Sequence, residues 1–293
     1  MRPFTIYHLY IDSFSAQQEK LVSIIVEIAK PDMIFLLGAS LYRRRSESIF
    51  NTTAPTSQHT ADYFLLILIP DISNRELHEW QDKIEHHCKA LMPVTTIVLQ
   101  TSTFEEWLKT DHPFAYTVLR SAAQIYDAGN LSFPAPGAIN ELTNKKDLEK
   151  YFTEGLNKSK EFLAGAELFR VREQNTMAAF MLHQSSEQAL QVMLKIGTGF
   201  HSNTHSIDRL IRYASLVSYQ LPDIFPQKSE SDKRLFNLLQ KAYIDTRYKE
   251  DYKISMPELL SLTEKVRRLQ EILADIGKAK FNSSASSSLN NDG

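Results

Sequence analysis

A stretch rich in Gly, Pro and Asn between residues 127 and 143 divides the chain into two parts with different hydrophobic patterns. Before it, strand-like and helix-like segments alternate; after it, apolar residues recur at spacings of three and four, as one face of a helix requires. The chain has 293 residues, 43% of them hydrophobic, which suits two domains of ordinary size. We therefore expect a mixed α/β domain followed by an up-and-down bundle of about five helices.

The expected boundaries follow from these patterns. Residues 1–128 are predicted to form the α/β domain, 129–143 the linker and 144–280 the helical bundle. The tail, 281–293, consists mostly of Ser and Asn, so it cannot bury a core and is predicted to be disordered.

Strands in the first part are predicted at 32–37, 62–69 and 94–99, and helices at 14–30, 73–91 and 104–109. Gly38, Ala39 and Ser40 interrupt the first strand. A polar loop rich in Ser, Thr and Asn is predicted from there to Ala61.

In the second part, helices are predicted at 146–170, 175–195, 205–217, 231–246 and 257–279. The last has a heptad-like stripe that is typical of core or dimer packing. The helix at 175–195 has one face suited to the core, formed by Ala178, Leu182, Ser185, Ala189, Val192 and Ile196.

His183 and Glu187 stand four residues apart on another face of that helix. Side chains at this spacing are neighbours, so a hydrogen-bonding pair would lie beside apolar packing. Polar residues that interrupt a segment patterned for burial indicate where function should be sought.

The segments 178–195, 205–207 and 243–252 occur in an order that resembles the HEPN domain, a small helical bundle found in bacteria beside nucleotidyltransferase-like domains. The resemblance covers roughly the last half of the chain. It implies nucleotide or RNA binding, usually by a homodimer. The implied binding residues are His183, Glu187, Arg247, Tyr248 and Tyr252.

In this interpretation Arg247 would pair with a phosphate, while Tyr248 and Tyr252 would stack on a base or bond to sugar or phosphate oxygens. The alternative is that Glu187 pairs with Arg247 and that both tyrosines cover the end of the bundle. HEPN ribonucleases carry Arg, four to six residues, then His. Residues 252–254 are Tyr, Lys and Ile, so the nuclease histidine is absent.

The strand, Gly38 to Ser40, and a second strand that begins at Asp62 resemble a minimal nucleotidyltransferase domain. Gly38, Ser40 and Arg43 would match its phosphate cradle, with backbone N–H groups at a helix start holding the triphosphate. An ordinary turn at Gly38 and a solvated loop around Arg43 are the alternatives.

Such domains also require three carboxylates, because two divalent metals need hard oxygen ligands that converge from one face. Asp62 matches the first, but Phe64 stands at the second position and Thr95 and Thr96 occupy the later strand. We therefore expect a degenerate domain and no cofactor, with Mg²⁺ relevant only if this domain is active.

Neither half of the chain is strongly basic. Residues 1–140 hold 11 Lys+Arg and 15 Asp+Glu, and residues 141–293 hold 22 and 20, which argues against an extended surface for duplex nucleic acid. The longest apolar run is too short to span a bilayer, and a single Cys88 cannot form an intrachain disulfide, so we expect a cytoplasmic protein without membrane contact.

The sequence thus predicts a two-domain protein that binds a nucleotide or RNA without catalysis, as a homodimer through its HEPN-like half. The alternatives are an active nucleotidyltransferase or an atypical HEPN ribonuclease of a toxin–antitoxin-like system. Because both catalytic sets are incomplete, we favour a protein that is not an enzyme and has no metal site.

Overall fold

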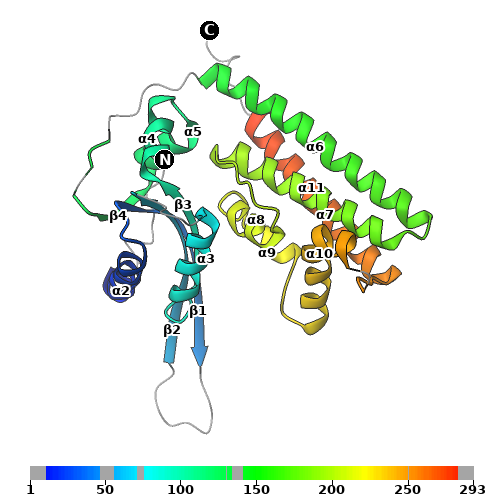
Figure 1. The fold of residues 1–293 in the computed structure, drawn as a ribbon, viewed down its shortest axis with the longest axis horizontal. Coiled ribbons are helices and arrows are strands. Elements are labelled where there is room, and N and C mark those ends of the chain that lie inside the picture. Colours follow the sequence, from blue (N-terminus) through cyan, green and yellow to red (C-terminus); the bar gives the residue numbers. More distant parts are fainter. Residues whose placement is uncertain are drawn as a thin grey trace, which may run out of the picture. The chain divides into compact units, whose positions relative to one another are not determined.

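The computed structural model describes residues 11–46, 56–70, 76–129, 131–133, 141–249 and 251–282 (Figure 1). The chain forms two compact units, Met1–Ala138 and Ile139–Gly293. The first contains a small mixed sheet with helices, and the second consists of helices in the part that the structure describes.

The first unit contains α2 (Ile11–Ala29), β1 (Met33–Ser46), β2 (Thr56–Ile69), α3 (Leu77–Cys88), β3 (Val94–Gln100), α4 (Thr101–Lys109), α5 (Pro113–Ser121) and β4 (Ala123–Asp127). The strand order is β3-β2-β1-β4. β2 pairs with β3 in parallel, whereas β1 pairs with β2 and with β4 antiparallel, which gives a mixed sheet.

β2 is buried on both faces of the sheet. Leu65, Ile67 and Ile69 belong to the core cluster that contains residues of α2 and α3, while Leu66 and Leu68 between them are also buried. This explains the continuous apolar run in the sequence, because successive side chains of a strand point to opposite faces. β4 was not predicted, since its sequence AQIYD is only half buried and lacks such a run.

The prediction of a break at Gly38 followed by a long loop is wrong. β1 continues through Gly38 and Ser40 to Ser46 and pairs with β2 from Thr56 onward. Gly38 lies at a register shift after Leu36, so the glycine accommodates a bulge within the strand. Cross-strand hydrogen bonding outweighed the polar composition on which the loop prediction rested.

The second unit contains α6 (Glu141–Val171), α7 (Asn175–Thr198), α8 (Ile207–Ala214), α9 (Leu221–Ile224), α10 (Glu230–Tyr248) and α11 (Met256–Asn282). α7 is central, since α6, α8, α10 and α11 all contact it. The predicted core face of α7 is confirmed, because its six residues are only 0–1% exposed: Ala178, Leu182, Ser185, Ala189, Val192 and Ile196. The predicted apolar stripe of α11 also enters the core cluster.

Two glycines allow close approach between the long helices. A Cβ at Gly155 of α6 would lie 2.3 Å from Val192 of α7, and one at Gly277 of α11 would lie 2.1 Å from the ring of Phe152 on α6. Real Cβ atoms do not tolerate such distances, so this packing requires glycine.

A buried polar network also joins these three helices. The hydroxyl groups of Ser159 on α6 and Ser185 on α7 each donate to the other residue's backbone carbonyl at 2.9 Å. The amide of Gln270 on α11 donates to both hydroxyl oxygens, at 2.9 and 3.0 Å. Because these polar groups are paired, their burial is tolerated in an otherwise apolar core.

The predicted start of the disordered tail is wrong by two residues. α11 continues to Asn282, and Phe281 is buried, with its ring centroid 5.6 Å from that of Phe152. Burial of the Phe281 side chain stabilises the end of α11, so the helix continues although the residues that follow are mostly polar. The rest of the tail, 283–293, lies outside the described residues.

Candidate functional site

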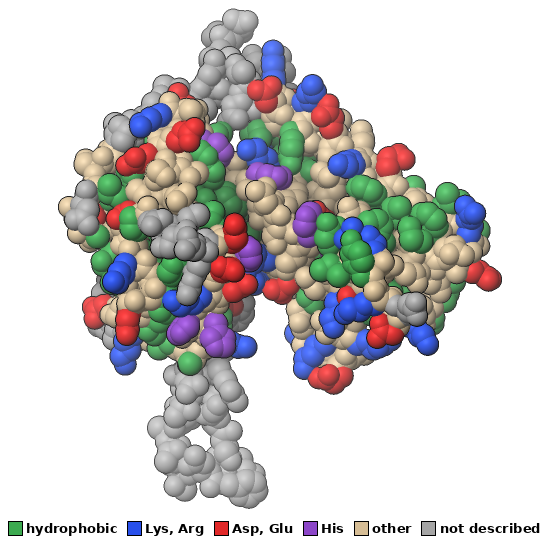
Figure 2. All heavy atoms as spheres, in the orientation of Figure 1, with side chains coloured by type: hydrophobic (Ala, Val, Ile, Leu, Met, Phe, Trp, Pro, Cys, Tyr) green, Lys and Arg blue, Asp and Glu red, His purple; other side chains and the backbone are tan. Residues whose placement is uncertain are grey.

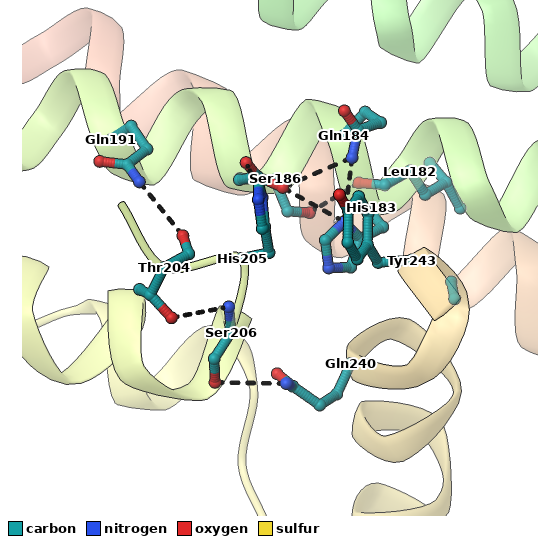
Figure 3. A network of polar contacts seen from close by, with 12 residues as sticks. Leu182, His183, Gln184, Ser186, Gln191, Thr204, His205, Ser206, Gln240 and Tyr243 are labelled. Carbon is teal, nitrogen blue, oxygen red and sulfur yellow. Dashed lines mark hydrogen bonds and ion pairs between the residues drawn. The ribbon is translucent and has the colours of Figure 1, made fainter. Parts of the chain in front are cut away.

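A row of side chains along α7 faces the segment that leads into α8 (Figure 3). The amide of Gln191 donates to the backbone carbonyls of Ser202 and Thr204. One turn earlier on α7, Oε1 of Glu187 lies 2.9 Å from Nδ1 of His205. Residues four apart on a helix share a face, so these contacts hold the segment against α7 along its length.

The beginning of α8 is fixed from a second direction. Ser206 caps the helix by accepting from the backbone N–H of Arg209, and Gln240 of α10 donates to the same serine hydroxyl at 3.2 Å. The other atom of that amide accepts from the N–H of Asp208 at 2.9 Å. His205, the residue before the cap, is therefore positioned by α7, α8 and α10 together.

The ring of Tyr243 on α10 lies between two histidines. It stacks on His205 with a centroid distance of 4.6 Å and an interplanar angle of 18°, and on His183 at 5.4 Å and 25°. Figure 3 shows the three rings grouped where α7, α10 and the segment before α8 meet. This arrangement gives the helical unit an aromatic cluster that is buried at His183 and exposed at His205.

Arg247 extends this cluster toward solvent. Its guanidinium carbon lies 4.3 Å from the centroid of Tyr243, 5.2 Å from that of Tyr248 and 5.7 Å from that of Phe180 on α7. The Nε atom donates to the backbone carbonyl of Tyr243 at 2.7 Å. The planar cation is therefore held against aromatic faces while it stays exposed.

His183 is in a different electrostatic environment from His205. Its side chain is fully buried, and burial, reinforced by the nearby charges of His205 and Arg247, lowers its pKa to about 4 despite the opposing effect of the His205 backbone. Nδ1 lies 3.6 Å from Oε2 of Glu187 and 3.4 Å from the amide of Gln184. The ring is therefore neutral at pH 7.

Among the sequence-predicted residues, His183, Glu187, Arg247 and Tyr248 are brought together by this cluster. Tyr252 is not. Its hydroxyl donates to the carbonyl of Leu238 at 2.9 Å, and burial, with the charges of Asp245 and Glu258, raises its pKa well above the usual range. Its ring packs against the helical core.

The alternative pairing of Glu187 with Arg247 is not formed, because the carboxylate of Glu187 lies against His205 and His183. His205 and Tyr243 are the site residues that sequence reasoning missed. Both lie in segments that carried the HEPN resemblance, so their place in those segments was the available signal.

The predicted phosphate cradle does not have its expected geometry. Gly38 and Ser40 lie within β1, where Ser40 pairs with Asp62 across the strands, and β2 follows without an intervening helix among the described residues. Continuous strand pairing here removes the helix N-terminus that would have supplied the N–H groups. Arg43 also belongs to β1, but its side chain lies outside the described residues.

The second and third carboxylate positions of the nucleotidyltransferase pattern lie side by side in the sheet, and neither position carries an acidic residue. Phe64 of β2 lies beside Thr95 of β3 in their parallel register. The next residue, Thr96, donates from both its backbone N–H and its hydroxyl to Oε1 of Glu85 on α3. Glu85 thus caps an amide on strand β3, and both threonines are buried.

The HEPN domain family model matches residues 153–276, which contain the whole cluster of His183, Glu187, His205, Tyr243 and Arg247. No curated protein matches the chain. The family match supports a HEPN domain in the second unit and indicates a nucleotide- or RNA-related function for it.

Across the described ranges, no three His, Cys, Asp or Glu side chains converge in a way that could hold a metal ion. In the same residues, none of the helices combines the length and the apolar character needed to cross a bilayer.

Proposed function

We propose that the second unit binds a nucleotide or RNA at the cluster of Arg247, Tyr243, Tyr248 and His205, and that it does so without cutting its ligand. The family match supports the ligand class. The location is supported by a cation and aromatic rings that share one exposed surface.

The main support comes from the guanidinium of Arg247. Stacking on Tyr243 and the Nε–H bond to a carbonyl fix its plane, and within the described part of the chain it forms no ion pair. A guanidinium held in this way can present its terminal N–H groups to phosphate oxygens as a bidentate donor. Tyr248, 76% exposed beside it, offers a face on which a base can stack.

The two residues at the positions that nuclease chemistry would use, His183 and Tyr252, are unsuited to proton transfer. His183 is buried and neutral, and position 252 carries a tyrosine whose hydroxyl is engaged with a carbonyl. Burial raises the pKa of Tyr252 further from neutrality, so it is a poor general base. No histidine stands at positions 252–254, where the ribonuclease pattern would place one after Arg247.

One observation favours a second candidate, an atypical ribonuclease. The side chain of His205 is 54% exposed, and Glu187 bonds to its Nδ1, which leaves Nε2 directed elsewhere. A carboxylate that orients an imidazole is a recurring general-base arrangement. Incubation with labelled RNA distinguishes the two, because cleavage that is lost in His205→Ala would favour the ribonuclease.

For the first unit we propose a degenerate nucleotidyltransferase-like domain without transfer activity. The mixed sheet and the single Asp62 of β2 support this proposal, while the strand at Gly38 to Ser40 departs from the expected cradle. Incubation with ATP and Mg²⁺ or Mn²⁺ tests it, since nucleotide transfer that is lost in Asp62→Ala would contradict it.

We further propose that the protein is a homodimer through its second unit, as the family match suggests. Ile244 of α10 and Leu260 of α11 have apolar side chains that are 55% and 45% exposed, respectively. Such a dimer would cover them. Light scattering after size-exclusion chromatography tests this, and a strict monomer would contradict it.

The binding proposal is tested by titrating the full chain with AMP and with labelled single-stranded RNA. We expect Arg247→Gln to weaken binding by about tenfold or more, because a charge-assisted hydrogen bond is removed. Lys241→Gln is the matched control, since Lys241 is exposed on the same helix and carries the same charge. No binding up to millimolar ligand, or equal weakening in both variants, would contradict the proposal.

A further inference from the structure

The imidazole of His205 has one nitrogen bound to α7 and one that faces away from it. Nδ1 lies 2.9 Å from Oε1 of Glu187, whereas Nε2 has no hydrogen-bond partner within the part of the chain that the structure describes. The two nitrogens lie on either side of Cε1, so a ring that points Nδ1 at α7 directs Nε2 away from this helix. Because the side chain is 54% exposed, Nε2 is open to a ligand.

The carboxylate of Glu187 determines which nitrogen of His205 carries the proton. The amide of Gln184 donates to Oε2 of Glu187 at 3.4 Å, while Oε1 lies against His205. An ionised carboxylate only accepts hydrogen bonds, so Nδ1 of His205 is the donor in this contact. The neutral ring then has a lone pair at Nε2, and the imidazolium has an N–H group there. Nε2 therefore repels a phosphate oxygen when the ring is neutral and donates to it when the ring is charged.

His205 and Arg247 border the same aromatic ring. The guanidinium carbon of Arg247 lies 4.3 Å from the centroid of Tyr243, and the imidazole centroid of His205 lies 4.6 Å from it. Histidine, basic and hydrophobic side chains also adjoin one another on the surface of the second unit in Figure 2. A phosphate that Arg247 holds beside Tyr243 is therefore close to His205 as well.

The charges around His205 leave room for one more anion. The titratable and charged groups of the helices packed against it are Glu187 and His183 of α7, Tyr243 and Arg247 of α10, and Asp208 of α8, which is paired with Arg212 at 3.1 Å. Glu187 favours the imidazolium and Arg247 opposes it. His183 stays neutral, because burial lowers its pKa to about 4. A phosphate on the Nε2 side would offset the charge of Arg247 and stabilise the imidazolium.

We propose that His205 binds a phosphate of the RNA strand as an imidazolium, with Nε2–H donating to a phosphate oxygen while Nδ1–H stays on Glu187, so that binding takes up one proton from solvent. This inference rests on the proposed function and specifies the protonation state in which its site holds the ligand. Because the proton and the phosphate favour each other, affinity rises as the pH falls through the range in which histidine side chains titrate. A protonated His205 also has no lone pair with which to act as a general base.

Isothermal titration calorimetry of the full chain with an unlabelled octanucleotide of uridine, with hydroxyl groups at both ends, tests the proposal. Neither the phosphodiesters nor the bases of this ligand titrate between pH 5.5 and 8. We expect the affinity of the native protein to rise by about tenfold or more from pH 8 to pH 5.5, because a charge-assisted hydrogen bond is added. Titrations in buffers of different ionisation enthalpy should show uptake of up to about one proton for each site filled.

Three variants assign the proton to one residue. In His205→Gln, proton uptake should disappear and the ratio of the affinities at pH 5.5 and pH 8 should fall to about one. Arg247→Gln should bind more weakly at every pH but keep the rise, since it retains the imidazole. His201→Gln is the matched control, because it removes another exposed histidine from the same segment, and it should keep both the rise and the uptake. Unfolding temperatures at each pH show which variants are folded.

An affinity of the native protein that does not change with pH would overturn this inference and leave the proposed function standing. A rise that His205→Gln retains, or that His201→Gln removes, would overturn it in the same way. Proton uptake by the native protein does not depend on any variant, so its absence would overturn the inference even if His205→Gln failed to fold. Absence of binding at every pH would remove both proposals together.

Discussion

Oε1 of Glu187 lies 2.9 Å from Nδ1 of His205, although eighteen residues separate the two in the sequence. The contact joins the middle of α7 to the residue before the cap of α8. It also sets the orientation of the imidazole that stacks on Tyr243. One carboxylate therefore fixes the solvent-facing side of the aromatic cluster.

This contact should be measurable as a coupling free energy. We expect a double-mutant cycle of Glu187→Ala and His205→Ala, followed by urea unfolding, to give about 0.5–1 kcal/mol, because the imidazole is half exposed and solvent weakens the pair. The pair Lys150 and Glu154, 3.9 Å apart and largely exposed, is the control and should show no measurable coupling. Equal coupling in both pairs would contradict a specific role for Glu187.

His183 makes the stability of the helical unit depend on pH. Its pKa is about 4 in the folded protein and near the ordinary histidine value of 6.5 when unfolded, so below 6.5 the unfolded chain binds a proton that the folded one excludes. The contribution of His183 to the free energy of unfolding is therefore at its full value above pH 6.5. It falls by about 3 kcal/mol as the pH approaches 4.

Urea unfolding at several pH values tests the His183 prediction. The native protein should lose more stability between pH 7 and 4.5 than His183→Gln, whose side chain does not titrate. Because other groups titrate in both proteins, the difference between their two pH profiles is the quantity of interest. Parallel profiles would show that His183 is protonated in the folded state as easily as in the unfolded one.

The surroundings of Gly277 and of Gly165 predict opposite effects on stability when each glycine is replaced by alanine. Gly277→Ala should destabilise the second unit by about 1–3 kcal/mol, since its methyl group would overlap the ring of Phe152. Gly165→Ala in α6 should stabilise it by about 0.5–1 kcal/mol, because the nearest atoms of Met181 lie at ordinary contact distances of 3.6 and 3.7 Å. Thermal unfolding of the two variants measures both effects, and a stabilising Gly277→Ala would contradict the packing.

Cys88 provides a probe of the first unit. The thiol is fully buried on α3, and burial, with the charge of Glu85, raises its pKa to about 11. Because the thiolate is the reactive form, alkylation by iodoacetamide at pH 8 should be at least about a hundredfold slower than in urea-unfolded protein. Mass spectrometry follows the reaction, and rapid labelling of the native protein would indicate that α3 is readily displaced from the sheet.

The helical unit was largely predictable from sequence because long helices repeat their apolar pattern many times. The spacing in α7 identified its core face, and all six of those positions are buried. The α/β unit was harder. Its β1–β2 hairpin consists of polar residues beyond Gly38, and strand pairing across such residues leaves no periodic signal.

Within the candidate site, sequence spacing identified the pair on α7 but not its partners. His183 and Glu187 are one helical turn apart, whereas His205 and Tyr243 reach them only through the packing of α8 and α10 against α7. Tyr252 follows Arg247 by five positions, yet the chain turns between α10 and α11 and directs its hydroxyl to Leu238. Contacts of this kind depend on tertiary structure, which short motifs do not encode.

The hydrogen-bonded group of Ser159, Ser185 and Gln270 fixes the alignment of α6, α7 and α11 along their axes. Leucine-rich helix faces tolerate sliding by one turn, because one apolar contact replaces another. A slip here would strand a buried amide and two hydroxyls without partners, which costs about 1–3 kcal/mol for each group. Misaligned bundles are thus penalised during folding, so α7 presents His183 and Glu187 at a single position along the axes of α6 and α11.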